Sequence, residues 1–249
     1  MLELEARDDK HDYPAPRASS LLEGARAQSE VDRVYAAIFD AMMDRRLLPG
    51  AKLTESTLCD IFSCSRAIVR SALSQLAYDK LVIHEPNRGA FVWQPSPKET
   101  QDVFDARMAL ECLLIDRLLT LPDLPSRLQT LRTMVEHERK AFEAGDRIAW
   151  LRLSNAFHVK LSDQLGNDVL TGFMYGLCAR TTLIIAHHDT PETSTCSYLE
   201  HEIILDKLEA NDGEGARKAM NDHLQDCVQR LHERDRTPSD PWMAFSVKR

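Results

Sequence analysis

The stretch that decides the fold is residues 47–92, LLPGAKLTESTLCDIFSCSRAIVRSALSQLAYDKLVIHEPNRGAFV. Thr54 and Ser65 are residue types that cap helix N-termini, and each is followed by apolar residues at helical spacing. The first helix is predicted to run from Thr54 to Phe62. The second begins after Ser65, and its buried side is formed by Val69, Leu73, Leu76 and Leu81.

Two short strands are predicted to follow these helices. Residues 81–83 and 90–93 are rich in apolar residues, and the Pro-Asn-Arg-Gly turn at 86–89 joins them into a hairpin. Upstream, apolar residues at helical spacing predict a helix over 31–46, which the Leu-Pro-Gly at 48–50 ends. Two short helices joined by a tight turn and followed by a basic hairpin indicate a winged helix-turn-helix.

The solvent side of the second short helix is predicted to read DNA. Arg66 and Arg70 lie four residues apart, so they project from one face, where arginine can contact O6 and N7 of guanine in the major groove. Two arginines at this spacing are ordinarily just solvated, but their place in the complete pattern favours DNA contact. A hairpin tip with a flexible glycine can approach the phosphate backbone or enter the minor groove. The expected DNA-binding residues are Ser65, Arg66, Arg70 and Ser71 on the helix and Asn87, Arg88 and Gly89 at the tip.

These residues resemble the winged helix-turn-helix of the GntR family of bacterial transcription regulators. The matching motifs are Leu-Pro-Gly-x-x-Leu at the entry, Ser-Arg-x-x-Val-Arg-x-Ala-Leu in the recognition helix and Pro-Asn-Arg-Gly-Ala-Phe-Val in the wing. The family usually has Thr-Pro after Ser-Arg and Glu after the second Arg, whereas this chain has Ala67, Ile68 and Ser71. The resemblance implies binding to a double-stranded DNA operator, and the missing Thr hydroxyl at Ala67 would remove a phosphate or base contact.

The remainder of the chain is predicted to be helical. Two prolines in residues 95–97 mark a linker, because proline interrupts a helix. Helices are predicted over 98–120, 124–144, 146–165, 167–188, 197–210 and 212–236. The fold class is therefore mainly α, with a winged helix-turn-helix domain at 31–94 and an all-α helical bundle at 98–236. Residues 1–30, which hold few apolar side chains, are expected to be a mobile arm, and 237–249 a tail.

Three histidines in the bundle are candidate metal ligands. His158, His201 and His223 each share a face with apolar residues of a different predicted helix, so all three can converge in the interior. Neutral imidazoles that converge in this way bind zinc or a similar divalent ion. The alternative is that each histidine is a hydrogen-bonded core residue. For three histidines on inward faces, the two interpretations are about equally favoured.

The bundle resembles the ligand-binding domain of the FadR-like branch of the same family, an FCD-type domain. The resemblance rests on Arg107 to Glu111, Phe157-His158, Glu200-His201 and His223-Leu224. Many members have an Asp four residues before the first His, whereas this chain has Ser154, with Asn155 beside it. The resemblance implies an effector pocket at these four motifs. The expected effector-binding residues are Arg107, Ser154, Asn155 and Arg180.

Arg107 has two interpretations. It can be one half of an exposed ion pair with Glu111, which contributes only about 0.2–0.5 kcal/mol. Alternatively, its guanidinium can bind the carboxylate of an organic acid with two hydrogen bonds, as its counterpart in the family faces the effector pocket. Arg180 is a weaker candidate for the same role.

The function expected from these observations is transcription regulation. A homodimer would bind a two-fold symmetric operator, and a small organic acid in the bundle would change its affinity, with repression as the default. The first rival is a metal-responsive regulator. The second is a metal-dependent hydrolase, but no nucleophile elbow, HExxH motif or phosphate-binding loop supports an enzyme, so no catalytic residue is expected.

Composition agrees with a cytoplasmic DNA-binding regulator. The net charge is -8, yet residues 33–94 hold eight Lys or Arg against six Asp or Glu and are the only basic segment. No run of about 20 apolar residues predicts a membrane span, and the acidic start MLELEARDDK is unlike a secretory signal. None of the six cysteines forms a C-x-x-C pair, which favours buried reduced thiols.

Overall fold

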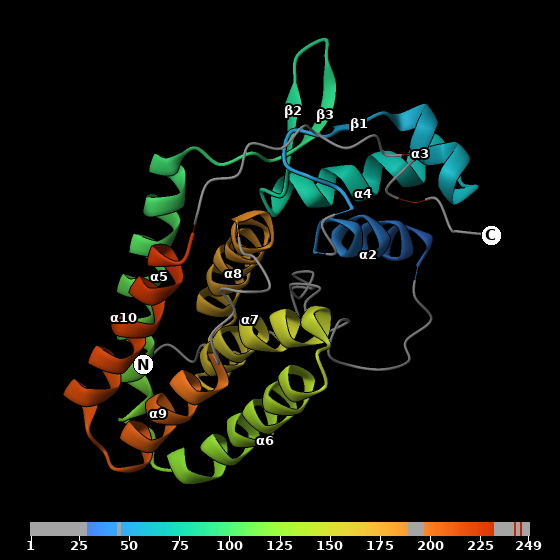
Figure 1. The fold of residues 1–249 in the computed structure, drawn as a ribbon. Helices are drawn as coiled ribbons and strands as arrows, with labels where there is room; N and C mark the ends of the chain where they lie inside the picture. The colour runs from blue at the N-terminus through green and yellow to red at the C-terminus, as the bar shows by residue number, and fades with distance from the viewer. Residues whose placement is uncertain (1–28, 44–45, 189–196, 232–241, 243–244, 246–249) are drawn as a thin grey trace, which may run out of the picture.

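A computed structural model describes residues 29–43, 46–188, 197–231, 242 and 245. The arm expected at 1–30 therefore lies almost wholly outside the described residues, as does most of the expected tail. The described chain forms a small head of helices and strands, here called the head, followed by a helical bundle, here called the bundle (Figure 1).

The head begins with three helices. Helices α2 (Glu30–Met43), α3 (Glu55–Phe62) and α4 (Arg66–Tyr78) pack around one apolar core. Ser63 adopts a left-handed conformation with φ 50°, which makes the tight turn between α3 and α4. The hydroxyl of Ser65 accepts a hydrogen bond from the backbone N–H of Ile68, as expected of an N-cap. Leu81 is buried as predicted, but it follows α4 instead of belonging to it.

The wing of the head has a strand that the sequence pattern did not predict. Strands β2 (Val82–Glu85) and β3 (Gly89–Val92) form the predicted hairpin, and β1 (Lys52–Leu53) pairs with β3 on its other side. All pairs are antiparallel, in the order β1-β3-β2. Gly89 has φ 101°, which an L side chain rarely adopts, so the glycine suits the turn. The tip of the hairpin points away from the bundle (Figure 1).

The bundle contains only helices among its described residues. A capping box starts α5, because Ser96 and Glu99 exchange side-chain hydrogen bonds with each other's backbone N–H. Helices α5 and α10 lie side by side, as do α6 and α7 (Figure 1). The helices are α5 (Pro97–Leu118), α6 (Leu124–Glu143), α7 (Arg147–Asp163), α8 (Asp168–His188), α9 (Ser197–Glu209) and α10 (Gly213–Gln229).

Predicted and observed bounds of these helices agree closely except at the end. The helix predicted over 212–236 stops at Gln229, and residues beyond 231 are outside the described part except 242 and 245. The mainly α fold class is confirmed. No helix of the described residues is both long and apolar enough to cross a membrane.

The head and the bundle meet through polar contacts and a continuous apolar core. Tyr35 of α2 donates to a carboxylate oxygen of Asp79 at 2.7 Å, and its hydroxyl lies 3.1 Å from that of Tyr175 on α8. Arg152 of α7 forms an ion pair with Asp40 of α2. Buried residues of both parts belong to one apolar cluster. The head is therefore held to the helices α7 and α8.

Candidate functional site

The predicted DNA-reading surface lies on α4. Arg66, Arg70 and Ser71 are all exposed, as a DNA-contacting face requires. Arg70 donates from Nε to both carboxylate oxygens of Glu55, at 2.8 and 2.9 Å. This hydrogen bond lowers the pKa of Glu55. Because the bonds use only Nε, the two terminal nitrogens of Arg70 have no partner in the described part of the chain and remain available to a base.

Glu55 was not among the predicted site residues. It stands in the first turn of α3, directly after the N-cap Thr54. An acidic residue at that place usually stabilises the N-terminus of its helix. Only the packing of α3 against α4 shows that it orients a DNA-reading arginine, so the contact could not be read from sequence spacing.

The tip of the wing presents a second set of polar groups. Asn87, Arg88 and Gly89 are all exposed. Arg88 forms an ion pair with Glu85, and its guanidinium lies 5.2 Å from the ring centroid of Phe91. The guanidinium of Arg88 is thus held against the hairpin that carries it. Ser65 is exposed too, and its hydroxyl accepts the capping hydrogen bond while its proton stays free for a phosphate.

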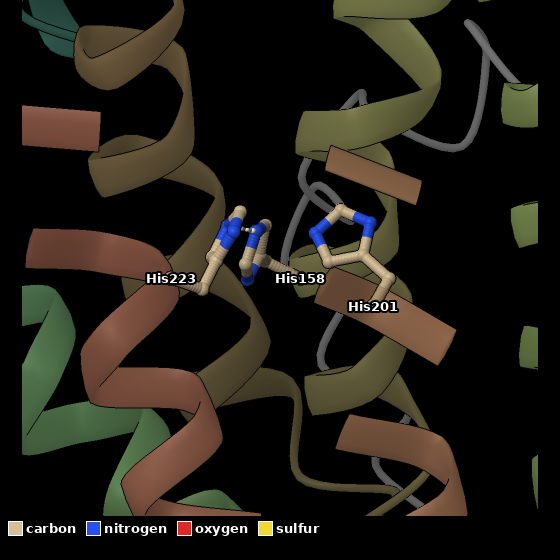
Figure 2. A group of neighbouring side chains, drawn as sticks. All are labelled: His158, His201 and His223. Carbon is tan, nitrogen blue, oxygen red and sulfur yellow. Dashed lines mark hydrogen bonds between the residues drawn. The ribbon is translucent and has the colours of Figure 1, made fainter. Parts of the chain in front are cut away.

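The three predicted histidines converge in the bundle. Figure 2 shows the rings of His158 from α7, His201 from α9 and His223 from α10 pointing toward one another. Their candidate ligand nitrogens all lie within 4.8 Å of one another, and all three residues are buried. The Nε2 atoms of His158 and His223 are 3.3 Å apart. These three residues are called the histidine centre below.

Each imidazole of the histidine centre has its own carboxylate at Nδ1. Glu111 lies 2.5 Å from Nδ1 of His158, Glu138 lies 2.8 Å from that of His201, and Glu200 lies 2.6 Å from that of His223. A carboxylate at Nδ1 accepts a hydrogen bond from the ring N–H there, which leaves a lone pair on Nε2. The three carboxylates therefore favour, for each ring, the tautomer that can bind a cation.

Burial keeps the centre ready to bind a cation. Removal from water lowers the pKa of His158 well below its usual value, and the nearby Arg107 charge lowers it further. Burial also lowers the pKa of His223, against the opposing effect of the hydrogen bond that Glu200 accepts from its ring. Nε2 of His201 is buried and has no hydrogen-bond partner among the described residues. A buried acceptor without a partner is costly, so the arrangement favours a bound cation.

A divalent metal ion fits this donor set. Zinc–nitrogen distances of about 2.0–2.1 Å in a tetrahedral site place ligand nitrogens roughly 3.3 Å apart, which is the separation of His158 and His223. The largest separation of 4.8 Å exceeds this distance, so one ring would have to shift on binding. Ser154, one turn before His158, is half-buried and offers no anionic ligand.

A second layer of hydrogen bonds supports His201. Glu138 is fully buried, and its other oxygen accepts from the hydroxyl of Ser197, which in turn accepts from the indole N–H of Trp150 at 2.9 Å. Sequence reasoning missed Glu138. The signal was present, because Leu128, Leu131 and Glu138 share one buried face of α6, and a carboxylate there calls for a partner.

Arg107 is buried, so its ion pair with Glu111 is not the exposed pair of the first interpretation. Its side chain is 2% exposed, and its Nε donates to Glu111 at 2.8 Å. Because Glu111 also binds His158, one carboxylate links Arg107 to the histidine centre. Nη2 lies 2.8 Å from the same oxygen of Glu111, which provides charge attraction, but it is not directed at any acceptor. Arg107 therefore keeps one buried donor available.

The other predicted effector-binding residues lie on α7 and α8. Asn155 is buried, and its amide donates to the carbonyl of Leu151 on the same helix. Arg180 lies elsewhere, in a groove between the head and the bundle. α8 presents Arg180 toward the wing and α5, and its role in effector binding stays a prediction.

Comparisons with known proteins agree with both halves of the chain. Residues 30–92 match the family described as bacterial regulatory proteins, gntR family, and residues 102–226 match the FCD domain. The HTH-type transcriptional repressor RspR of Escherichia coli is 25% identical over 212 residues, 84% of this chain and 91% of that protein. The gluconate operon transcriptional repressor of Bacillus subtilis is 29% identical over 133 residues, 51% of each chain.

A solved structure shares the fold. A GntR transcriptional regulator from Rhodococcus sp. RHA1 superposes with a TM-score of 0.68 at 24% identity, over 80% of this chain and 95% of that one. The winged head, the helical bundle and both family matches lead to one assignment. The chain belongs to the GntR family of bacterial transcriptional regulators, and its C-terminal half is an FCD domain.

Proposed function

We propose that the chain is a homodimeric repressor whose operator affinity is controlled by a small organic acid bound at the histidine centre. The observation that carries this proposal is the pairing of two features in one chain: an exposed arginine face on α4 and a buried, cation-ready centre in the bundle. The relatives named as repressors support the direction of control.

The DNA-binding part of the proposal rests on exposure and orientation. Arg66 and Arg70 are exposed near the N-terminus of α4, and Glu55 holds Nε of Arg70. Recognition helices of this type contact base edges with their N-terminal residues. The wing residues Asn87 and Arg88 would contact the phosphate backbone, which adds affinity without sequence information.

The ligand part of the proposal uses the histidine centre and Arg107. His158, His201 and His223 would hold a divalent ion, which supplies a Lewis-acidic anchor for a carboxylate. The buried Nη2 of Arg107 would donate to the same carboxylate. Ser154 leaves room where other members carry an Asp, so an effector oxygen or a water molecule would take that position.

Coupling between the two parts would pass through α7 and α8. His158 and Arg152 lie on the same helix, and Arg152 contacts Asp40 of the head. Tyr175 of α8 contacts Tyr35 of the head. A ligand that shifts α7 against its neighbours would shift the head with it. Coupling of about 1–3 kcal/mol corresponds to roughly 5–150-fold in operator affinity.

The direct test of the ligand part is metal binding and its effect on DNA. Metal-free protein should bind one zinc ion per chain by calorimetry, His223→Ala should lose this binding, and Ser154→Asp should strengthen it by adding an anionic ligand. If neither wild type nor Ser154→Asp binds zinc, the histidines form only a polar core.

A carboxylic acid screen separates the proposal from its first rival. For a metal-loaded protein, an organic acid should change operator affinity, and Arg107→Ala should remove this response without changing ligand-free DNA binding. If operator affinity follows zinc concentration alone, the protein is a metal-responsive regulator. The histidine centre makes this rival the second candidate, because the three imidazoles form a set of metal donors that needs no organic ligand.

The proposed homodimer is tested by measuring the mass of the purified protein in solution. Val169 and Phe173, one turn apart on α8, are 68% and 65% exposed, and exposed apolar groups of this kind favour association. Light scattering of the purified protein should give twice the chain mass of 28.3 kDa. A monomer at micromolar concentration would contradict the proposed assembly.

A further inference from the structure

A groove at the junction of the head and the bundle is separate from the histidine centre. It has a volume of about 390 Å³, within the lower range of small-ligand sites. Trp93 from the head and Val103, Ala106 and Leu177 from the bundle give it apolar walls. Arg180 from α8 and Lys80 from the head add positive charge.

Arg180 is the unusual member of this groove. Its Nε is buried and has no hydrogen-bond partner among the described residues. Burial also lowers the pKa of Arg180, which reports the cost of holding an unpaired charge there. A guanidinium in this condition is stabilised by an anion that reaches it.

The acidic residues of the groove are engaged by other groups. Glu99 accepts from the backbone N–H and the hydroxyl of Ser96, both at 2.8 Å. Asp102 accepts from Lys98 at 2.6 and 2.9 Å. Glu99 attracts Arg180 only at longer range. Among the described residues, Lys80 and Arg180 are therefore the charged groups of the groove that have no close partner.

We propose that this junction groove binds a small amphipathic carboxylate, with its acid group on Arg180 and Lys80 and its apolar part against Trp93, Val103 and Leu177. Such a ligand would touch the head and the bundle at once, so it would fix the head relative to α5 and α8. This second ligand site uses no residue of the histidine centre and does not depend on the proposed function.

Calorimetry with hexanoate tests the site, and hexanamide is the uncharged control. Metal-free wild-type protein should bind hexanoate saturably. It should bind hexanamide at least about 10-fold more weakly, because the amide lacks the charge-assisted hydrogen bond. Arg180→Gln should weaken hexanoate binding by about 10-fold or more. Arg180→Lys should weaken this binding less, because lysine keeps the positive charge. Circular dichroism confirms that each variant is folded.

Two control variants locate the binding. Arg117→Gln removes an exposed cation at the other end of α5, and His223→Ala disrupts the histidine centre. Both should bind hexanoate as the wild type does. The proposal is overturned if hexanoate does not bind at about 10 mM, if folded Arg180→Gln binds it unchanged, or if His223→Ala loses it while Arg180→Gln keeps it. The last result would assign the acid to the histidine centre and support the proposed function instead.

Discussion

At the scale of single residues, carboxylates position the functional side chains of this chain. Glu55 holds Arg70 on the predicted DNA-reading surface, and the buried Glu111 and Glu138 and the half-buried Glu200 hold the histidines by Nδ1. Ion pairs at the surface contribute little to stability, so the Glu55–Arg70 pair matters for orientation. Buried carboxylates cost free energy unless paired, so the glutamates of the histidine centre are stabilised by the rings that they orient.

The recognition arginines and the wing arginine should differ in what they recognise. Arg66→Ala should cost about 1–3 kcal/mol at the best operator and relax the base preference at one position. Arg88→Ala should weaken binding about equally for all sequences and reduce the salt dependence, because it contacts phosphate. Fluorescence anisotropy with matched and scrambled duplexes at several salt concentrations measures both effects. Equal losses on both duplexes for Arg66→Ala would exclude a base contact.

Glu138 should control metal affinity without touching the metal. Glu138→Gln should lower zinc affinity by about 10–100-fold, because the carboxylate that fixes the ring of His201 is lost. Glu136→Gln on the same helix is the matched control, since Glu136 pairs with Arg139 at the surface. Competition titrations with a zinc-binding dye give both affinities. Similar affinities for the two variants would show that Glu138 serves only the fold.

At the scale of elements, sequence patterns predicted the helices well because most bury one face. The bounds of α3 and α4 follow from capping residues and apolar spacing. Strand β1 was missed because two residues carry no periodicity, and its pairing with β3 is set by tertiary contacts. The Tyr35–Tyr175 contact joins residues 140 positions apart, which no local pattern reveals.

The residues of the candidate site were likewise predicted only in part. The convergence of the three histidines was predicted because each lies on an apolar face of its helix. The place of Arg180 was not, because a helix with apolar residues on most sides gives no single inward direction. Helical spacing tells which side of a helix is buried, whereas the neighbour on that side depends on packing.

The capping box at the start of α5 should stabilise the boundary between the head and the bundle. Ser96→Ala should lower the free energy of unfolding by about 0.5–2 kcal/mol, because it removes the hydroxyl that caps the helix. Ser74→Ala, at an exposed position within α4, is the control and should be within about 0.5 kcal/mol of wild type. Urea unfolding compares the three proteins. A Ser96→Ala variant as stable as the control would show that the cap contributes nothing.

At the scale of the whole molecule, the junction of head and bundle is the place where the proposed ligand and DNA sites would communicate. It contains the Tyr35–Asp79–Tyr175 contacts, the Asp40–Arg152 pair and the groove of Arg180. A ligand that changes these contacts would shift the head relative to the bundle.

The junction should make stability depend on pH through Asp79. Burial raises the pKa of Asp79, against the hydrogen bond from Tyr35, so the folded chain takes up this proton more readily than the unfolded chain. Wild type should therefore lose stability as the pH rises through the raised pKa of Asp79. Asp79→Asn stays neutral and still accepts from Tyr35, so it should be more stable than wild type at pH 8, and this difference should shrink toward pH 4.

Urea unfolding at several pH values between 4 and 8 measures this difference. Asp60→Asn, an exposed position on α3, serves as the control and should differ little from wild type over the range. An advantage of Asp79→Asn that stays constant or grows toward low pH would contradict the assigned cost of burying the charge.

The most direct test of the central claim is a selection of duplexes from a random DNA library by the purified chain. The account predicts enrichment of a two-fold symmetric sequence with half-site centres about 10 base pairs, or a multiple of that, apart. It also predicts that the double variant Arg66→Ala, Arg70→Ala enriches no such sequence although it is folded. No enriched sequence with wild type, or the same sequence and affinity with the double variant, would contradict the account.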